Sequence, residues 1–167
     1  MNAIDNAGFT AHQVYLKVSA WCAYQDRCYA EVEKKLASYA IDEETSYQII
    51  SKLREENFID EARYARSFAG GKFRIKHWGK LKIAAHLKAR QIGSRLIQEA
   101  IESEIPDDDY RNTLHKILAS KLQELTEDSK AIAAQKAKQF AFQKGYEIWL
   151  ITDVLNELEP RKKSKLF

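Results

Sequence analysis

The chain has 167 residues, of which 45% are hydrophobic and 31% are charged, with a formal net charge of +3. This composition is globular, and the low content of Gly (6) and Pro (2) argues against a turn-rich β fold. The first ten residues lack the regions of a signal peptide, and no apolar run reaches the ~18 residues that span a bilayer. We therefore expect a soluble, cytoplasmic protein.

Apolar residues recur with helical spacing along almost the whole chain, as Val32 and Leu36 do. The segment 146–158 begins with residues typical of a strand, but its later apolar spacing favours a helix. The pattern predicts an all-α chain with nine helices, at 12–24, 29–40, 43–57, 60–74, 79–91, 93–104, 107–126, 129–144 and 146–158. Three aspartates stand where N-caps are expected: Asp42, Asp60 and Asp107.

Apolar positions repeat when the chain is shifted by about fifty residues. Shifts of 51 and then 54 residues align five positions across three segments. We interpret them as three tandem three-helix repeats that stack to share a core. The aligned sets are Val32, Ile83 and Ala137; Leu36, Leu87 and Ala141; Ile41, Ile92 and Tyr146; Ile49, Ala100 and Val154; Ile50, Ile101 and Leu155. The expected organisation is an N-terminal arm at 1–11, repeats at 12–58, 59–105 and 106–159, and a basic tail at 160–167.

The middle repeat contains a window without acidic residues, from Ala62 to Gln98. Its ten cations leave 17 basic residues against 24 acids in the rest of the chain, an excess of seven negative charges. A concentrated basic field attracts polyanions or acidic protein surfaces. The predicted binding residues are the ten cations of the window: Arg63, Arg66, Lys72, Arg74, Lys76, Lys80, Lys82, Lys88, Arg90 and Arg95.

Residues for catalysis or metal binding do not group in the sequence. The four histidines are scattered, and no Ser or Cys lies in a recognisable nucleophile setting. Cys22 and Cys28 have no second Cys or His pair at zinc spacing, so we expect buried, free thiols. We therefore expect no enzyme activity, no metal and no cofactor. Trp21 and Trp149 lie in apolar stripes and are expected in the core, whereas Trp78 lies in the loop before the basic helix.

Three segments resemble the RecX family of bacterial regulators of the RecA recombinase. FIDEARYARSF, from Phe58 to Phe68, and WGKLKIAAHLKARQIG, from Trp78 to Gly93, are similar to the family's central signature. QFAFQKGYEIWLITDVL, from Gln139 to Leu155, is similar to its last repeat. The resemblance extends over Val14 to Leu158, nearly the whole chain.

The resemblance implies an elongated, curved array of three helical repeats that lies along the RecA filament on DNA. It implies a monomer without enzyme activity that inhibits filament growth, ATP hydrolysis and strand exchange, in recombination, DNA repair and the SOS response. The basic window would then face the filament groove or the phosphates of single- or double-stranded DNA, without base specificity. The sequence departs from the family pattern at Lys80 and Lys82, where arginine is frequent, and at Gln91, where glycine is usual.

Two other functions are compatible with the sequence. Short three-helix units with a basic helix also suit an independent helix-turn-helix DNA-binding protein. Helical repeats also suit an adaptor for another acidic protein. A pull-down with RecA, with and without single-stranded DNA, separates these possibilities.

Overall fold

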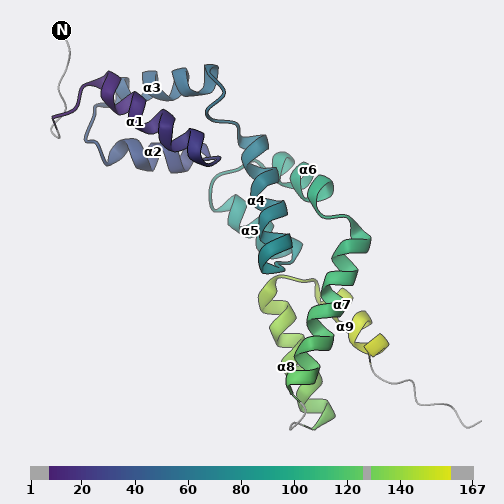
Figure 1. Cartoon of the computed structure of the whole chain (residues 1–167). Coiled ribbons are helices and arrows are strands. Elements are labelled where there is room, and N and C mark those ends of the chain that lie inside the picture. Colours follow the sequence, from purple (N-terminus) through teal and green to yellow (C-terminus); the bar gives the residue numbers. More distant parts are fainter. Residues whose placement is uncertain (1–7, 126–128, 159–167) are drawn as a thin grey trace, which may run out of the picture. The chain divides into compact units, whose positions relative to one another are not determined.

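The computed structural model describes residues 8–125 and 129–158. This part of the chain contains nine α-helices and no strand (Figure 1). The N-terminal arm up to residue 7 and the predicted basic tail lie outside the described residues. The helices are α1 (Ala11–Tyr24), α2 (Tyr29–Ala37), α3 (Glu43–Glu55), α4 (Glu61–Lys76), α5 (Lys80–Lys88), α6 (Ser94–Glu104), α7 (Asp107–Glu124), α8 (Lys130–Lys144) and α9 (Ile148–Leu158).

The all-α prediction is confirmed, and the segment that begins like a strand is the helix α9. Seven helices are shorter than predicted, because α2, α3, α5 and α7 end earlier, in turns, and α6, α8 and α9 begin one or two residues later. Asp42 and Asp60 accept hydrogen bonds from the backbone N–H groups of Thr45 (2.8 Å) and Arg63 (2.9 Å), as N-caps do. The expectation for Asp107 is wrong, because it is the first residue of α7 and the N-cap is Pro106. Its carboxylate still lies at the positive end of the helix dipole.

The repeat alignment agrees with burial in the structure. Of the fifteen aligned positions, thirteen are buried, and the other two, Ile41 and Ile101, are half-buried. The prediction that Trp149 lies in the core is wrong, because its side chain is 69% exposed. Trp21 is half-buried, and it packs against the core of the first three helices. Helical spacing therefore identified the buried stripe, but it placed a neighbouring tryptophan on the wrong side of α9.

Left-handed backbone recurs at the same spacing as the apolar positions. Ala40 (φ 53°), Gln91 (φ 63°) and Gly145 (φ 94°) follow the second helix of each predicted repeat, 51 and 54 residues apart. After α5, Gln91 N–H donates to Lys88 O (2.9 Å) and Ile92 N–H to Leu87 O (3.2 Å). The same two bonds close α8, through Gly145 and Tyr146. This pair of bonds is the Schellman motif, so the second helices of the second and third repeats end in the same way.

The described residues pack into two compact units. One contains the chain up to Phe68 together with Leu87–Ala100, and the other contains Ala69–His86 and the chain from Ile101 onward. In the first unit, α1, α2 and α3 enclose an apolar core. It includes Val14, Val18, Cys22, Val32, Leu36, Ile49, Ile50, Leu53 and Ile59. Cys22 and Cys28 are free and buried, and burial raises the pKa of both thiols.

In the second unit, the C-terminal end of α8 meets the N-terminal end of α5. Gly79 N–H donates to Lys144 O (2.8 Å) and Leu81 N–H donates to Gly145 O (3.1 Å). A Cβ atom at Gly79 would lie 2.1 Å from Gly145 O, so a side chain at this position would force the two helix ends apart. The carbonyl groups left free at one helix end thus satisfy the N–H groups left free at the other. We call this contact the glycine crossing.

Two stacked tyrosines lie beside the glycine crossing. The Tyr110 and Tyr146 rings are 4.8 Å apart, and both side chains are buried. The Tyr110 hydroxyl accepts from Lys80 N–H (3.0 Å), a third free amide of α5, and donates to Glu147 (2.7 Å). The Tyr146 hydroxyl has no hydrogen-bond partner within the described residues. The two hydroxyls therefore have opposite expected contributions to stability.

The left-handed helix ends generate one prediction. Gln91→Gly should stabilise the protein by about 0.5–1 kcal/mol, because glycine adopts this backbone without the Cβ strain. Gly145→Ala should cost at least about 2 kcal/mol, because its Cβ would meet the Lys82 backbone nitrogen at 2.6 Å and the φ of +94° is strained. Urea unfolding midpoints measure both. A destabilised Gln91→Gly protein would contradict the assignment of strain to residue 91.

The tyrosine pair generates a matched prediction. Tyr110→Phe should cost about 1–3 kcal/mol, because the Lys80 amide and the Glu147 carboxylate lose their common partner. Tyr146→Phe should leave stability unchanged or raise it slightly, because it removes a buried hydroxyl that makes no bond. Both changes remove one oxygen from neighbouring rings, so chemical unfolding compares them directly. Equal losses would argue against the hydrogen bonds of Tyr110 as the source of the difference.

Candidate nucleic-acid interface

The ten predicted binding residues divide equally between the two compact units. Five belong to the first unit: Arg63, Arg66, Lys88, Arg90 and Arg95. Five belong to the second unit: Lys72, Arg74, Lys76, Lys80 and Lys82. Each unit is therefore described separately.

Folding brings acidic residues from outside the window to half of the cations. Five of the ten form ion pairs with carboxylates. The pairs are Arg63 with Asp26 (2.7 Å) and Asp60 (3.8 Å), Arg74 with Glu104 (3.2 Å), Lys80 with Asp107 (2.6 Å), Arg90 with Glu31 (3.7 Å), and Arg95 with Glu99 (2.7 Å). The expectation of an unopposed field is therefore wrong for these five side chains. Their charges are compensated locally before any partner binds.

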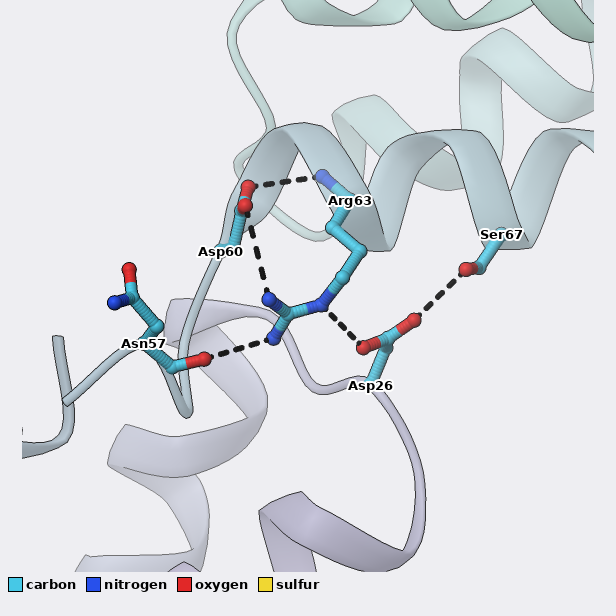
Figure 2. A network of polar contacts seen from close by, with 5 residues as sticks. All are labelled: Asp26, Asn57, Asp60, Arg63 and Ser67. Atoms are coloured by element: carbon cyan, nitrogen blue, oxygen red, sulfur yellow. Dashed lines mark hydrogen bonds and ion pairs between the residues drawn. The ribbon is translucent and has the colours of Figure 1, made fainter.

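Arg63 occupies the centre of a polar network in the first unit (Figure 2). Its Nε donates to Asp26 Oδ1 (2.7 Å), and its Nη2 donates to the backbone oxygen of Asn57 (3.0 Å). Ser67 Oγ donates to the other carboxylate oxygen of Asp26 (2.8 Å). The network links the start of α4 to the α1–α2 turn and to the end of α3 (Figure 2). This geometry gives Arg63 a role in holding α4.

The same network changes the titration of Asp26. Burial raises the pKa of this carboxyl, but the hydrogen bonds from Arg63 and Ser67 and the charge of Arg63 outweigh burial, so the pKa lies below its usual value. The ionised form is therefore favoured in the folded state. Its contribution to stability is present above the unfolded pKa of about 3.9 and is lost as pH falls through the lower folded pKa.

Arg90 lies in a second network of the first unit. Its Nε is 3.7 Å from Glu31 Oε1, and its guanidinium lies over the Phe68 ring at 5.1 Å. Tyr64 also donates to Glu31 Oε1 (3.3 Å), and the N–H of Cys28 donates to Glu31 Oε2 (3.4 Å). Arg90 thus joins the end of α5 to the start of α2 and the middle of α4. These contacts give it a structural role as well.

Four other cations of the window, Arg66, Lys76, Lys82 and Lys88, have no carboxylate partner among the described residues. Arg66, Lys76 and Lys88 are exposed, and their side chains form no hydrogen bond or ion pair with any described residue. Lys72 and Lys82 lie over the Trp78 ring, with their Nζ atoms 5.3 Å and 4.8 Å from its centroid. In each unit, these four cations carry positive charge that no described ion pair compensates.

Lys144 is a candidate that the sequence did not indicate. It ends α8 beside the glycine crossing, and its Nζ donates to the backbone oxygen of Lys76 (3.0 Å). Lys82 Nζ makes the reciprocal contact, to the backbone oxygen of Gln143 (3.1 Å). Lys144 lies outside the acid-free window, so a search for that window misses it. The repeat alignment provides the missing signal, because the 54-residue shift places Lys144 opposite Arg90.

The described residues show neither a metal centre nor a membrane helix. No group of three His, Cys, Asp or Glu side chains among them could hold a metal ion. None of their helices combines the length and hydropathy needed to cross a bilayer. The chemistry that they offer is electrostatic and aromatic.

The Arg63 network generates a prediction with a control on the same helix. Arg63→Met should cost about 1–3 kcal/mol at pH 7, because half-buried Asp26 loses a charged donor. It should also flatten the decline in stability below about pH 4, because Asp26 then keeps a more ordinary pKa. Arg66→Met, which removes an exposed guanidinium without described partners, should do neither. Chemical unfolding from pH 3 to pH 7 measures both effects, and matching curves for the two variants would contradict the role of Arg63.

Known proteins are similar to this chain in sequence and in fold. Residues 60–101 match the family described as RecX, second three-helix domain. The chain is 25% identical over 150 residues to the "Regulatory protein RecX" of Oceanobacillus iheyensis, covering 90% of this chain and 55% of that protein. It is 32% identical over 130 residues to the protein of the same name from Clostridium botulinum, covering 76% of this chain and 59% of the relative. The chain thus spans somewhat more than half the length of these relatives.

Solved structures of the same name share the fold. The crystal structure of RecX from Lactobacillus salivarius superposes with a TM-score of 0.79 at 24% identity, covering 89% of this chain and 96% of that one. A second structure, of "regulatory protein RecX", has a TM-score of 0.79 at 22% identity, covering 87% and 71%. The matched segment 60–101 contains the whole acid-free window. The chain is therefore similar to RecX proteins along most of its length, with a match to the second three-helix domain of RecX at residues 60–101.

Proposed function

We propose that this protein is a RecX-type regulator that binds the RecA filament on DNA and inhibits filament growth, ATP hydrolysis and strand exchange. The observation that carries the proposal is that the RecX domain match and the acid-free window coincide, over residues 60–101 and 62–98. The part of the chain most similar to RecX is therefore also its most basic part. This surface would act in the cytoplasm, during recombination, repair and the SOS response.

The mechanism that we propose is binding without catalysis. A basic surface attracts the phosphates of DNA or an acidic groove of the filament, and a bound protein then obstructs changes in the filament. Cations already paired with carboxylates contribute weakly at a distance, because each pair approximates a dipole. The attraction would therefore come from the cations without such partners, chiefly Arg66, Lys76, Lys82 and Lys88. We also propose that the protein acts as a monomer.

The helix-turn-helix alternative has less support from the composition of α5. Direct readout in the major groove uses Asn or Gln on adenine and Arg or Lys on guanine. The sequence of α5, KLKIAAHLK, contains three lysines but no Arg, Asn or Gln. A lysine that contacts a phosphate carries no information about the base sequence. The composition therefore favours binding to backbone phosphates, independent of sequence.

The proposal predicts that charge reversal in the window weakens inhibition of RecA. The variant Arg66→Glu, Lys76→Glu and Lys88→Glu reverses three exposed cations that hold no described ion pair. We expect it to need about ten-fold more protein to halve RecA ATP hydrolysis on single-stranded DNA, because steering toward an acidic groove becomes repulsion. ATP hydrolysis by the cognate RecA is measured over a concentration series of each protein.

A matched control separates the effect of reversing charges in the window from the effect of changing the net charge. Lys34→Glu, Lys116→Glu and Lys130→Glu also reverse three exposed lysines without described ion pairs, all outside the window. This variant should inhibit almost as well as the wild type, and circular dichroism should show both variants to be helical. Equal weakening of the two variants would remove the window from the mechanism. A wild-type protein with no effect on RecA would overturn the functional proposal.

A further inference from the structure

We propose that the glycine crossing carries an anchor for the phosphodiester backbone of nucleic acids, formed by Lys82 and Lys144 and positioned by Trp78. All three residues belong to the second compact unit. We call them the lysine anchor. The inference deepens the proposed function and rests on it for the identity of the ligand, but not for the geometry. It adds a residue from the third repeat, and it separates these contacts from Arg74 and Lys80, which are held by Glu104 and Asp107.

Both ammonium groups of the lysine anchor are already held in place. Lys82 Nζ donates to Gln143 O (3.1 Å) near the end of α8, and Lys144 Nζ donates to Lys76 O (3.0 Å) at the end of α4. An ammonium group has three donors, so each lysine has two more to offer a ligand. Immobilising a free lysine side chain costs about 0.5–1.5 kcal/mol on binding. Part of this cost is already met in the folded protein, which favours binding at this place.

Trp78 supports the geometry of the anchor. The Nζ atoms of Lys72 and Lys82 lie 5.3 Å and 4.8 Å from the centroid of its ring, and the His86 ring lies 4.6 Å away. A cation over an indole ring is attracted by about 0.5–1 kcal/mol at an exposed site. Trp78 is therefore a positioning residue for Lys82. The nearby cations also make its ring an integral part of a basic surface.

Local negative charge is too small to compensate these lysines. The ends of α4 and α8 each contribute roughly −0.5 of an elementary charge, together about −1. Lys76, Lys82 and Lys144 contribute three positive charges, and none of them pairs with a described carboxylate. Two acids of this unit already have other partners: Asp107 pairs with Lys80, and Glu147 accepts from Tyr110. Capping of the two helix ends therefore leaves an excess of positive charge.

The chemistry of this excess fits phosphodiesters. Each ammonium is a compact point charge that binds a phosphate oxygen without selecting a base. The lysines come from two helices, Lys82 from the start of α5 and Lys144 from the end of α8, and their bonds to backbone oxygens hold them at the glycine crossing. A strand of nucleic acid presents phosphates in series, so it can engage both lysines at once. The anchor should therefore bind any base sequence.

The test is the salt dependence of DNA binding in the absence of a recombinase. The ligands are a 20-nucleotide oligo(dT) and a 20-base-pair duplex of mixed sequence, each carrying a fluorophore, titrated between 50 and 300 mM NaCl. For Lys82→Gln with Lys144→Gln, the slope of log K against log salt should fall by about 1.4 on oligo(dT) and about 1.8 on the duplex. At 0.1 M salt, affinity for oligo(dT) should fall by about 25-fold, because each of the two lost phosphate contacts costs about five-fold.

Two controls keep the test specific. Lys116→Gln with Lys130→Gln removes two exposed lysines from the same unit and should change the slope by less than half as much. Trp78→Leu should lower affinity and slope, whereas Trp78→Phe should restore both, because phenylalanine preserves an aromatic face for Lys82. Melting temperatures verify that all variants are folded.

Each outcome has a distinct meaning. An unchanged slope on both ligands, or an equal change in the control pair, would overturn the anchor. A reduced slope on both ligands supports a phosphodiester anchor for either kind of strand, and a reduction on only one identifies the strand that it serves. RecA ATP hydrolysis is measured separately, so persistent inhibition by the Lys82 and Lys144 variant would retain the proposed function while moving its contacts away from DNA.

Discussion

The second unit depends on a backbone contact that only glycine permits. At the glycine crossing, Gly79 and Gly145 approach so closely that the N–H groups of α5 reach the carbonyl groups at the end of α8. Helix ends usually need side chains or water to satisfy these groups. Here the carbonyl groups at the end of α8 accept from the N–H groups at the start of α5, and the Tyr110 hydroxyl is a further acceptor for α5. The position of Lys82 and Lys144 beside one another follows directly from this contact.

Folding changes the charge pattern that the sequence shows. The middle repeat has no acids of its own, yet acidic side chains from Asp26 to Asp107 neutralise half of its cations. Arg63 and Arg90 are used to hold helices together, because guanidinium groups can bind several oxygens or cover an aromatic ring. Lysines with no carboxylate partner remain available for an external anion. The basic segment therefore contains cations with structural contacts and other cations that we propose bind DNA.

Sequence alone predicted the fold well, because helical spacing and the 51- and 54-residue shifts report the buried stripe of each repeat directly. It could not show which cations of the window are paired with carboxylates. Ion pairs such as Arg63 with Asp26 join residues 37 positions apart, and no local pattern specifies such a pair. Lys144 was missed because its proximity to Lys76 depends on the glycine crossing. Trp149 was misplaced because a residue next to a buried stripe can lie on either side of it.

The two buried thiols make the protein convenient for chemical labelling. Cys22 and Cys28 are 5% and 0% exposed, and burial raises the pKa of both, so few thiolates form at neutral pH. Alkylating reagents that attack thiolates should therefore spare the native cysteines in the folded state. A single cysteine introduced at an exposed position such as Lys88 would then carry a fluorophore selectively, without removal of either native residue. Because the two native thiols do not react, the single label reports the contacts of the basic segment.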